Sequence, residues 1–247
     1  MTPSRSPGAP VRAVLFDVGG TLLNVHPSVG EVYAATAADH GIRVTADHVQ
    51  RAFPGAWERS LERSHARGYR TSDTILRAEW LEIVRDTFGS SVPADKLDRL
   101  FGDLYERFVS AAVWKIVPGI HQTIDYLRSR GIRLGILSNW DSRLPRLLKD
   151  LQIEDSFDFV VVSHGVGFEK PHSAMFDEAL RLARTDPGCV LHVGDSYGAD
   201  IVPARRLGLR TLWVAPASKR ALHADSGEGV GRLPAEPLPL WSELLLR

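Results

Sequence analysis

Several features that mark particular classes of protein are scarce in this chain. A single cysteine, Cys189, excludes an internal disulfide and leaves no thiol cluster for zinc. The 30 basic and 30 acidic side chains give no net charge, which removes the electrostatic reason to expect nucleic acid or an anionic membrane as a partner. Apolar runs are strand-sized, and residues 1–10 lack the apolar stretch of a signal peptide. We therefore expect a cytoplasmic protein that binds neither nucleic acid nor membrane.

The composition is that of an ordinary globular protein. The 247 residues are 44% hydrophobic and 24% charged, which is enough for a substantial core. Proline and glycine in residues 1–10 predict a flexible N-terminal segment. Lysine is rare, with five in the chain, so each lysine is informative. No pattern indicates a particular oligomeric state.

Short apolar runs rich in branched residues recur along the chain and predict buried strands. These runs are residues 11–18, 132–137, 159–162, 190–193 and 211–214. Apolar periodicity between them predicts helices at residues 142–151, 173–183 and 197–207. Alternating strands and helices predict an α/β fold with a doubly wound parallel sheet, which binds its ligands at the carboxyl ends of its strands.

The segment after the first strand breaks this rhythm. It carries apolar residues at helical spacing, as in Leu97, Leu100 and Leu104, and its nearly ninety residues are far too long for one crossover. We predict a helical subdomain at residues 25–114, inserted into a core formed by residues 11–24 and 115–247. Glycine and proline in residues 226–239 predict a loop before a short helix at residues 240–246.

Four arginines at near-helical spacing stand out in this inserted segment: Arg59, Arg63, Arg67 and Arg70. They form either a solvated helix face or a surface that selects an anionic ligand. On the fourth core strand, we interpret His192 and Cys189 as packing residues.

Polar groups follow four of the core segments, where a parallel sheet opens. They are Asp17 in FDVGGT, Ser138 and Asn139 in ILSNWD, Lys170 in GFEKPH, and Asp195 and Asp200 in HVGDSYGAD. Each alone is explained by turns or caps, but four in order point to one site.

The chemistry of these groups favours a magnesium and phosphate site. Asp17, Asp195 and Asp200 would repel one another unless a cation lay among them. Hard carboxylate oxygens without histidine or cysteine favour Mg²⁺. Lys170 and the Ser138 hydroxyl could hold phosphate oxygens, and Asp17 in line with the phosphorus is a candidate nucleophile.

Four segments, FDVGGTL, LSN, EKP and GDSYGAD, resemble the motifs of the haloacid dehalogenase-like superfamily with a helical cap of the first type. The resemblance spans about residues 12–214, and NVHPSVGEVYAATAADHGI, LSNWDSRL and HVGDSY are similar to one branch of the superfamily. It implies a hydrolase that forms an aspartyl-phosphate and acts on a small phosphorylated metabolite. The implied roles are catalysis by Asp17 and Lys170, phosphate binding by Thr21, Ser138, Asn139 and Lys170, Mg²⁺ binding by Asp17, the Gly19 carbonyl and Asp195, and support from Asp200.

The chain departs from this pattern at Gly19. Phosphatases of the superfamily carry a second aspartate there, which protonates the leaving group, and losing such an acid costs roughly 10²- to 10⁴-fold in rate. One account is a phosphatase restricted to good leaving groups, or one that recruits His26, with Trp140 lining the substrate pocket. A second account is dehalogenation or phosphonate cleavage, which omit this acid. A third is a degenerate protein that binds phosphate or a partner without turnover. We predict the Mg²⁺-dependent phosphatase and keep the other two as alternatives.

Overall fold

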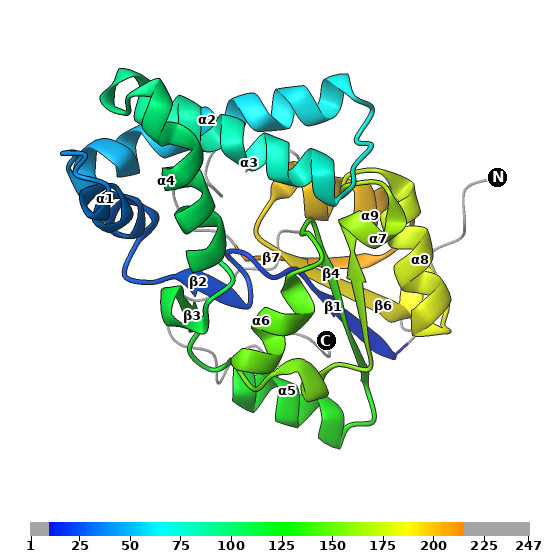
Figure 1. Cartoon of the computed structure of the whole chain (residues 1–247). Coiled ribbons are helices and arrows are strands. Elements are labelled where there is room, and N and C mark those ends of the chain that lie inside the picture. Colours follow the sequence, from blue (N-terminus) through cyan, green and yellow to red (C-terminus); the bar gives the residue numbers. More distant parts are fainter. Residues whose placement is uncertain (1–9, 215–247) are drawn as a thin grey trace.

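The computed structural model describes residues 10–214, and its centre is a five-stranded parallel sheet (Figure 1). The strand order is β5-β4-β1-β6-β7. The strands are β1 Ala13–Phe16, β4 Arg133–Ser138, β5 Phe159–Val162, β6 Val190–Gly194 and β7 Arg210–Trp213. Residues 1–9 and the helix predicted at 240–246 lie outside the described residues.

Helices cover both faces of the sheet, as a doubly wound fold requires. Val14 and Phe16 point to one face, where they share a buried cluster with residues of α5 Ile120–Ser129 and α6 Leu144–Asp150. Ala13 and Leu15 point to the other face, toward α8 Ser173–Ala183 and α9 Val202–Arg206. The predicted α/β class is thus confirmed, and α8 has the bounds that the sequence predicted.

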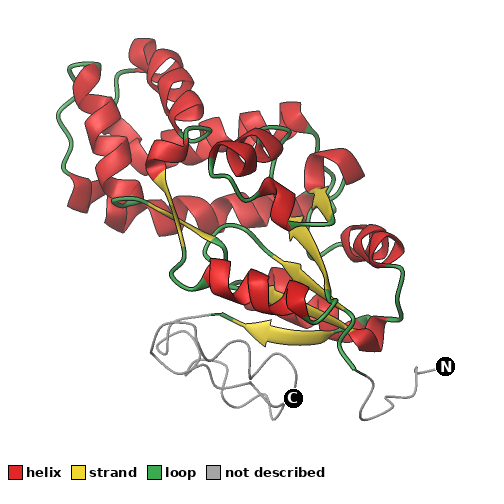
Figure 2. Ribbon diagram, turned by 90° about the horizontal axis from the view of Figure 1, so that it is seen from below, coloured by secondary structure: helices red, strands yellow, loops and turns green. Residues whose placement is uncertain are grey.

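Four helices are inserted between β2 and β3, and Figures 1 and 2 both show them grouped beside the core. They are α1 Val29–Asp39, α2 Ala46–Ala66, α3 Asp73–Phe88 and α4 Ala94–Arg107. They surround a cluster of their own that includes Tyr33, Phe88 and Leu100. The chain enters and leaves these four helices through an antiparallel pair of strands, β2 Leu23–Val25 and β3 Trp114–Ile116. The sequence did not predict this ribbon.

The arginines of α2 serve interhelix packing. Arg63 and Arg67 both pair with Glu79 of α3, at 2.9 and 2.5 Å, and Arg59 pairs with Asp86 at 2.9 Å. These three side chains therefore join α2 to α3, which neither interpretation of the sequence anticipated.

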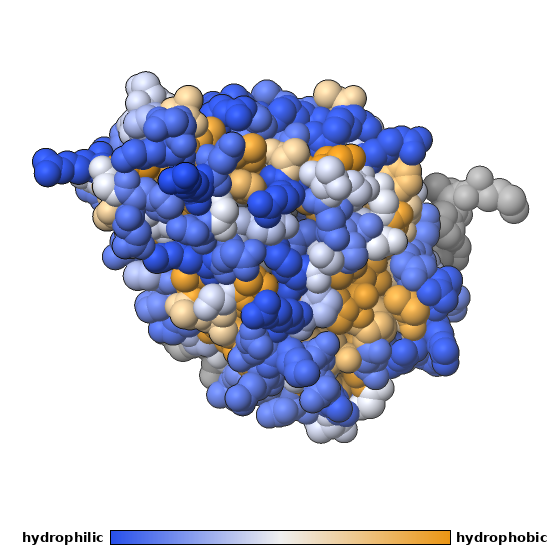
Figure 3. Space-filling model, viewed as in Figure 1, coloured by the Kyte–Doolittle hydropathy of each residue, from blue (hydrophilic) through white to orange (hydrophobic). Residues whose placement is uncertain are grey.

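The remaining elements are short. They are α7 Ser163–Val166, the 3₁₀ turns Gly89–Ser91, Ala111–Val113, Glu154–Ser156 and Pro187–Cys189, and a π-helical turn Tyr197–Ile201 that leads into α9. The face seen in Figure 3 is mostly hydrophilic, with apolar side chains in smaller areas between. Within residues 10–214, no helix is both long and apolar enough to cross a membrane.

Candidate active site

Three neighbouring strands bring polar residues to one edge of the sheet. Phe16 is in register with Ile136 of β4 and with Val193 of β6, so these strands end at nearly the same level. Asp17 follows β1, and its backbone N–H donates to Val193 O at 2.9 Å. Ser138 ends β4, and Asp195 follows β6. The central strand of a parallel sheet thus carries Asp17 to the position where such sheets bind ligands.

Lys170 links two of the carboxylates. Its Nζ donates to Asp17 Oδ1 at 2.8 Å and to Asp200 Oδ1 at 2.5 Å. Ser138 Oγ donates to the same Asp17 Oδ1 at 2.9 Å. Lys170 is 4% exposed and Asp200 is 1% exposed, so the pairing lies in a medium where charge interactions are strong.

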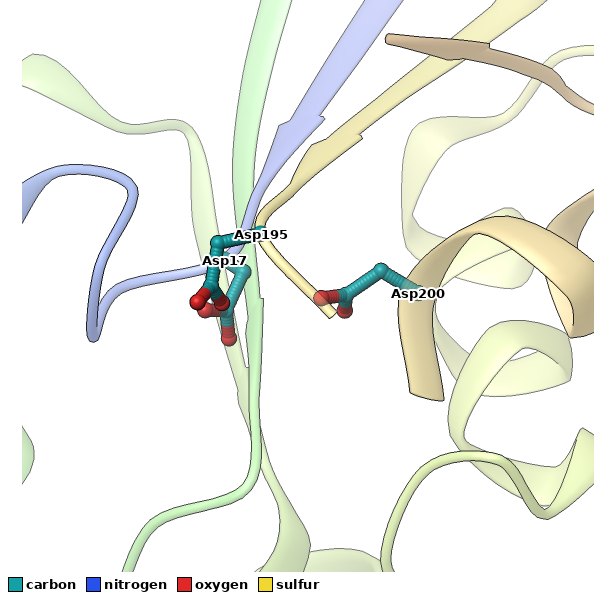
Figure 4. A group of neighbouring side chains, drawn as sticks. All are labelled: Asp17, Asp195 and Asp200. Carbon is teal, nitrogen blue, oxygen red and sulfur yellow. The ribbon is translucent and has the colours of Figure 1, made fainter. Parts of the chain in front are cut away.

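Asp17, Asp195 and Asp200 each offer an oxygen within 4.8 Å of the others. Figure 4 shows the Asp17 and Asp195 carboxylates side by side, with Asp200 approaching from another direction. Three carboxylates thus surround a small volume beside the Lys170 ammonium, and all of their donor atoms are hard oxygens. The residues present therefore fit a divalent, oxygen-seeking cation such as Mg²⁺.

The pKa values of these groups follow from burial and from Lys170. Burial raises the pKa of Asp17, and the Asp200 charge adds to this effect while Lys170 opposes it. Burial alone would also raise the pKa of Asp200, but Lys170 and His192 outweigh it and hold that pKa below its usual range. Burial alone would lower the pKa of Lys170, but the two carboxylates raise it. The two carboxylates therefore favour the charged ammonium form of Lys170 in this site.

Two adjacent glycines shape the loop after β1. Gly20 has a φ of +77°, and a Cβ there would meet Asp195 Oδ2 at 2.7 Å. Glycine at position 20 therefore allows the backbone to turn and the Asp195 carboxylate to approach. A Cβ at Gly19 would meet the Trp140 ring at 3.8 Å, which is ordinary contact.

Alanine at each glycine should give opposite results. Gly20→Ala should destabilise the protein by about 1–3 kcal/mol, because it combines a left-handed backbone with displacement of Asp195. Gly19→Ala, its matched control, should leave stability unchanged or raise it by up to ~1 kcal/mol. Urea unfolding of both variants measures the difference. Equal stabilities would contradict the assigned role of Gly20.

Other predicted residues lie around this cluster. Asn139 is bound to the Lys170 backbone, since Lys170 N–H donates to its Oδ1 at 2.6 Å and its Nδ2 donates to Lys170 O at 3.0 Å. Thr21 Oγ1 is buried and has no hydrogen-bond partner among the described residues. Trp140 stacks at a tilt on Trp114, with ring centres 5.3 Å apart.

Among residues 10–214, no hydrogen bond or ion pair joins the His26 side chain to this cluster. Its side chain is exposed just after β2, and its backbone N–H donates to Val113 O at 2.9 Å. Its role as a substitute acid therefore stays a prediction.

The sequence interpretation missed the role of His192. This fully buried residue packs edge-on against Phe176, as a packing residue would, but its Nε2 also lies 3.1 Å from Asp200 Oδ1. Ser196 N–H holds the other Asp200 oxygen at 3.0 Å. The available signal was alternation along β6, which turns His192 away from the face that carries Leu191 and Val193.

Comparison with known proteins decides the family. Residues 11–208 match the model of the haloacid dehalogenase-like hydrolases. The chain belongs to this family. Haloacid dehalogenase-like hydrolase domain-containing protein 3 of Xenopus laevis is 35% identical over 212 residues, covering 83% of this chain and 85% of that protein. The resemblance inferred from the four motifs, and from the segments typical of one branch, is confirmed.

Two further proteins are similar to this haloacid dehalogenase-like hydrolase, one in sequence and one in structure. A glyceraldehyde 3-phosphate phosphatase of Pyrococcus abyssi is 31% identical over 151 residues, or 55% of this chain and 63% of that protein. The solved structure of the hydrolase YfnB from Bacillus subtilis, bound to magnesium, superposes with a TM-score of 0.61. It is 23% identical and covers 83% of this chain and 89% of its own, and this likeness shows the shared fold.

Proposed function

We propose that this hydrolase is a Mg²⁺-dependent phosphatase that acts on a small phosphorylated metabolite through an aspartyl-phosphate on Asp17. The observation that carries the proposal is the position of Lys170, a buried cation between Asp17 and Asp200 with Ser138 on the same carboxylate oxygen. A lysine and a hydroxyl beside one carboxylate can hold phosphate oxygens while that carboxylate attacks.

The two oxygens of the Asp17 carboxylate have different surroundings. Among residues 10–214, the two hydrogen bonds to the Asp17 side chain both end at Oδ1, and neither involves Oδ2. In the proposed reaction an Asp17 oxygen forms the bond to phosphorus, and the bond from phosphorus to the leaving oxygen breaks. The leaving group departs as an anion, which takes up a proton from solvent only where its basicity requires one. Water then attacks the phosphorus, which releases phosphate and restores the carboxylate.

Asp17, Asp195 and the Gly19 carbonyl would hold the Mg²⁺ ion, with Asp200 supporting the site by fixing Lys170. When bound, the ion neutralises charge on the transferring phosphoryl group. The three carboxylate oxygens that lie within 4.8 Å of one another and the magnesium bound by YfnB support this assignment.

The surroundings of Gly19 point to substrates with reactive leaving groups. Glycine supplies no side chain at this position to protonate an alkoxide, and a Cβ placed there would meet the Trp140 ring at 3.8 Å. Aryl and acyl phosphates release stable anions and need no such acid. We therefore assign the enzyme to reactive phosphate esters and anhydrides.

Two alternatives remain as hypotheses with less support. Phosphate or partner binding without turnover is favoured by Gly19, but it gives no reason for Lys170 to be shared between two carboxylates. Phosphonate cleavage would need a cap lysine, and Lys96 donates instead to His40 O at 3.0 Å within the inserted helices. Dehalogenation would not need Asp195 for a metal.

We propose that residues 25–114 act as a cap over this site. The inserted helices contact the core directly after Ser138 and Asn139: Asp73 accepts from Ser142 N–H at 2.9 Å, and Tyr105 donates to Asp141 at 3.2 Å. A cap seated there would exclude water from the phosphoryl group and select the leaving group.

A phosphate-release screen tests the function. Aryl and acyl phosphates should be hydrolysed in the presence of Mg²⁺, alkyl phosphates should be slower by about 10²-fold or more, and a chelator should remove the activity. Calorimetry with Mg²⁺ and vanadate separates the alternatives. Binding of both without turnover of any ester would favour the non-catalytic hypothesis, and binding of neither would end the proposal.

A further inference from the structure

The segment that precedes Lys170 is paired with the inserted helices. Thr71 N–H donates to Gly167 O at 3.0 Å, and Glu169 N–H donates to Tyr69 O at 2.8 Å. Residues 69–71 and 167–169 therefore lie antiparallel, like two very short strands. The Arg70 guanidinium adds a contact 5.3 Å from the centre of the Phe168 ring. The loop between α2 and α3 and the loop of Lys170 thus form one unit.

A buried side-chain contact fastens this unit. Ser64, in the last turn of α2, donates its hydroxyl hydrogen to the Glu169 carboxylate, and the two residues are 6% and 8% exposed. The Ser64 carbonyl also accepts from Tyr69 N–H at 2.9 Å. A carboxylate in so buried a place depends on its hydrogen bonds, so separating it from Ser64 is costly.

Lys170 is consequently held from two sides. On the core side, Asn139 binds both the N–H and the carbonyl of Lys170. On the side of the inserted helices, its chain neighbour Glu169 binds Ser64. The two neighbouring side chains reach in different directions, Glu169 to α2 and Lys170 to Asp17 and Asp200.

We propose that Glu169 is a positioning residue, which places the Lys170 ammonium between the two carboxylates through its hydrogen bond to Ser64. The Lys170 ammonium then reaches its position only when α2 is packed against residues 167–169. Separation of residues 64–71 from residues 167–169 releases one of the two anchors of Lys170. The kinetic consequences rest on the proposed phosphatase function, and the structural consequence does not.

Three variants test the hydrogen bond by kinetics. Ser64→Ala and Glu169→Ala should each lower kcat for an aryl phosphate by about tenfold, with a smaller change in KM. Glu169→Gln keeps an acceptor for the Ser64 hydroxyl and should stay within about twofold of the wild type. The double variant Ser64→Ala/Glu169→Ala should be no slower than either single variant, because both remove the same contact. A Glu169→Gln enzyme as slow as Glu169→Ala would overturn the proposal.

Amide hydrogen exchange tests the same contact without any activity. Ser64→Ala and Glu169→Ala should speed exchange in residues 167–170 by about tenfold. The matched control is Ser60→Ala, since Ser60 is also buried on α2 but donates to Trp57 O within its own helix. Unchanged exchange in both test variants would overturn the positioning role. A wild type inactive on every phosphate would instead refute the proposed function, and the exchange result would still decide this inference.

Discussion

Asp17→Asn is expected to lower Mg²⁺-dependent phosphate release from an aryl phosphate by at least ~10³-fold, the scale seen when a nucleophile is removed. The amide keeps the shape of the carboxylate and an oxygen for Ser138 and Lys170 to bind, but it is not a nucleophile. Release of phosphate under saturating substrate measures the loss.

The same substitution should leave the fold intact. Burial raises the pKa of Asp17, so its ionised form is less favourable in the folded protein than in water, and a neutral amide should not lower the melting temperature in a chelating buffer. Asp177→Asn, an exposed site on α8, is the matched control and should retain full activity. An Asp17→Asn enzyme with wild-type turnover would remove Asp17 from the reaction.

Gly19→Asp is expected to raise turnover of alkyl phosphates by about 10- to 10²-fold, approaching the range of a positioned general acid. The backbone at Gly19 lies outside the left-handed region, and a Cβ there meets the Trp140 ring at 3.8 Å, so the side chain can be accommodated. Aryl phosphates, whose leaving groups need no proton, should change little. The ratio of kcat/KM for the two substrate classes measures the effect.

Gly19→Asn is the control for this gain of function. It fills the same space with a side chain that cannot act as an acid. An equal rise in Gly19→Asn would assign the effect to packing against Trp140. No rise in either variant would mean that something other than the absent carboxylate limits the reaction on alkyl esters.

The sequence predicted those parts of the fold that depend on local pattern. The predicted runs of branched residues correspond to strands β4 to β7 of the structure. Helix α8 spans residues 173–183 as predicted, because its apolar periodicity matches the face that it buries. The ribbon of β2 and β3 escaped prediction because its strands have three residues each and pair across nearly ninety residues of chain. The predicted helix 197–207 begins instead with a π turn, where the Asp200 carboxylate accepts from Ser196 N–H.

In the candidate site, too, the sequence predicted what depends on local pattern and missed what depends on tertiary contacts. Asp17, Ser138 and Asn139 could be found because each lies at or directly after the end of a strand that is visible in the sequence. Lys170 could be found because it lies in the connection that follows another such strand, β5. The partners of these residues could not, because they depend on tertiary contacts. From the sequence, His192 is an ordinary buried strand residue, and only the fold shows its contact with Asp200. Glu169 is likewise an ordinary loop residue, and only the fold shows its hydrogen bond with Ser64 of α2.

The central position of β1 has a consequence for how the molecule loses its activity. This strand is fully buried and paired on both sides, so it opens only when the whole sheet does. Lys170 instead extends from a connecting loop with a tertiary anchor at either side. Mild denaturant should therefore abolish the activity well before the spectroscopic signal of the sheet declines, since Lys170 should be displaced first and Asp17, the proposed nucleophile, last.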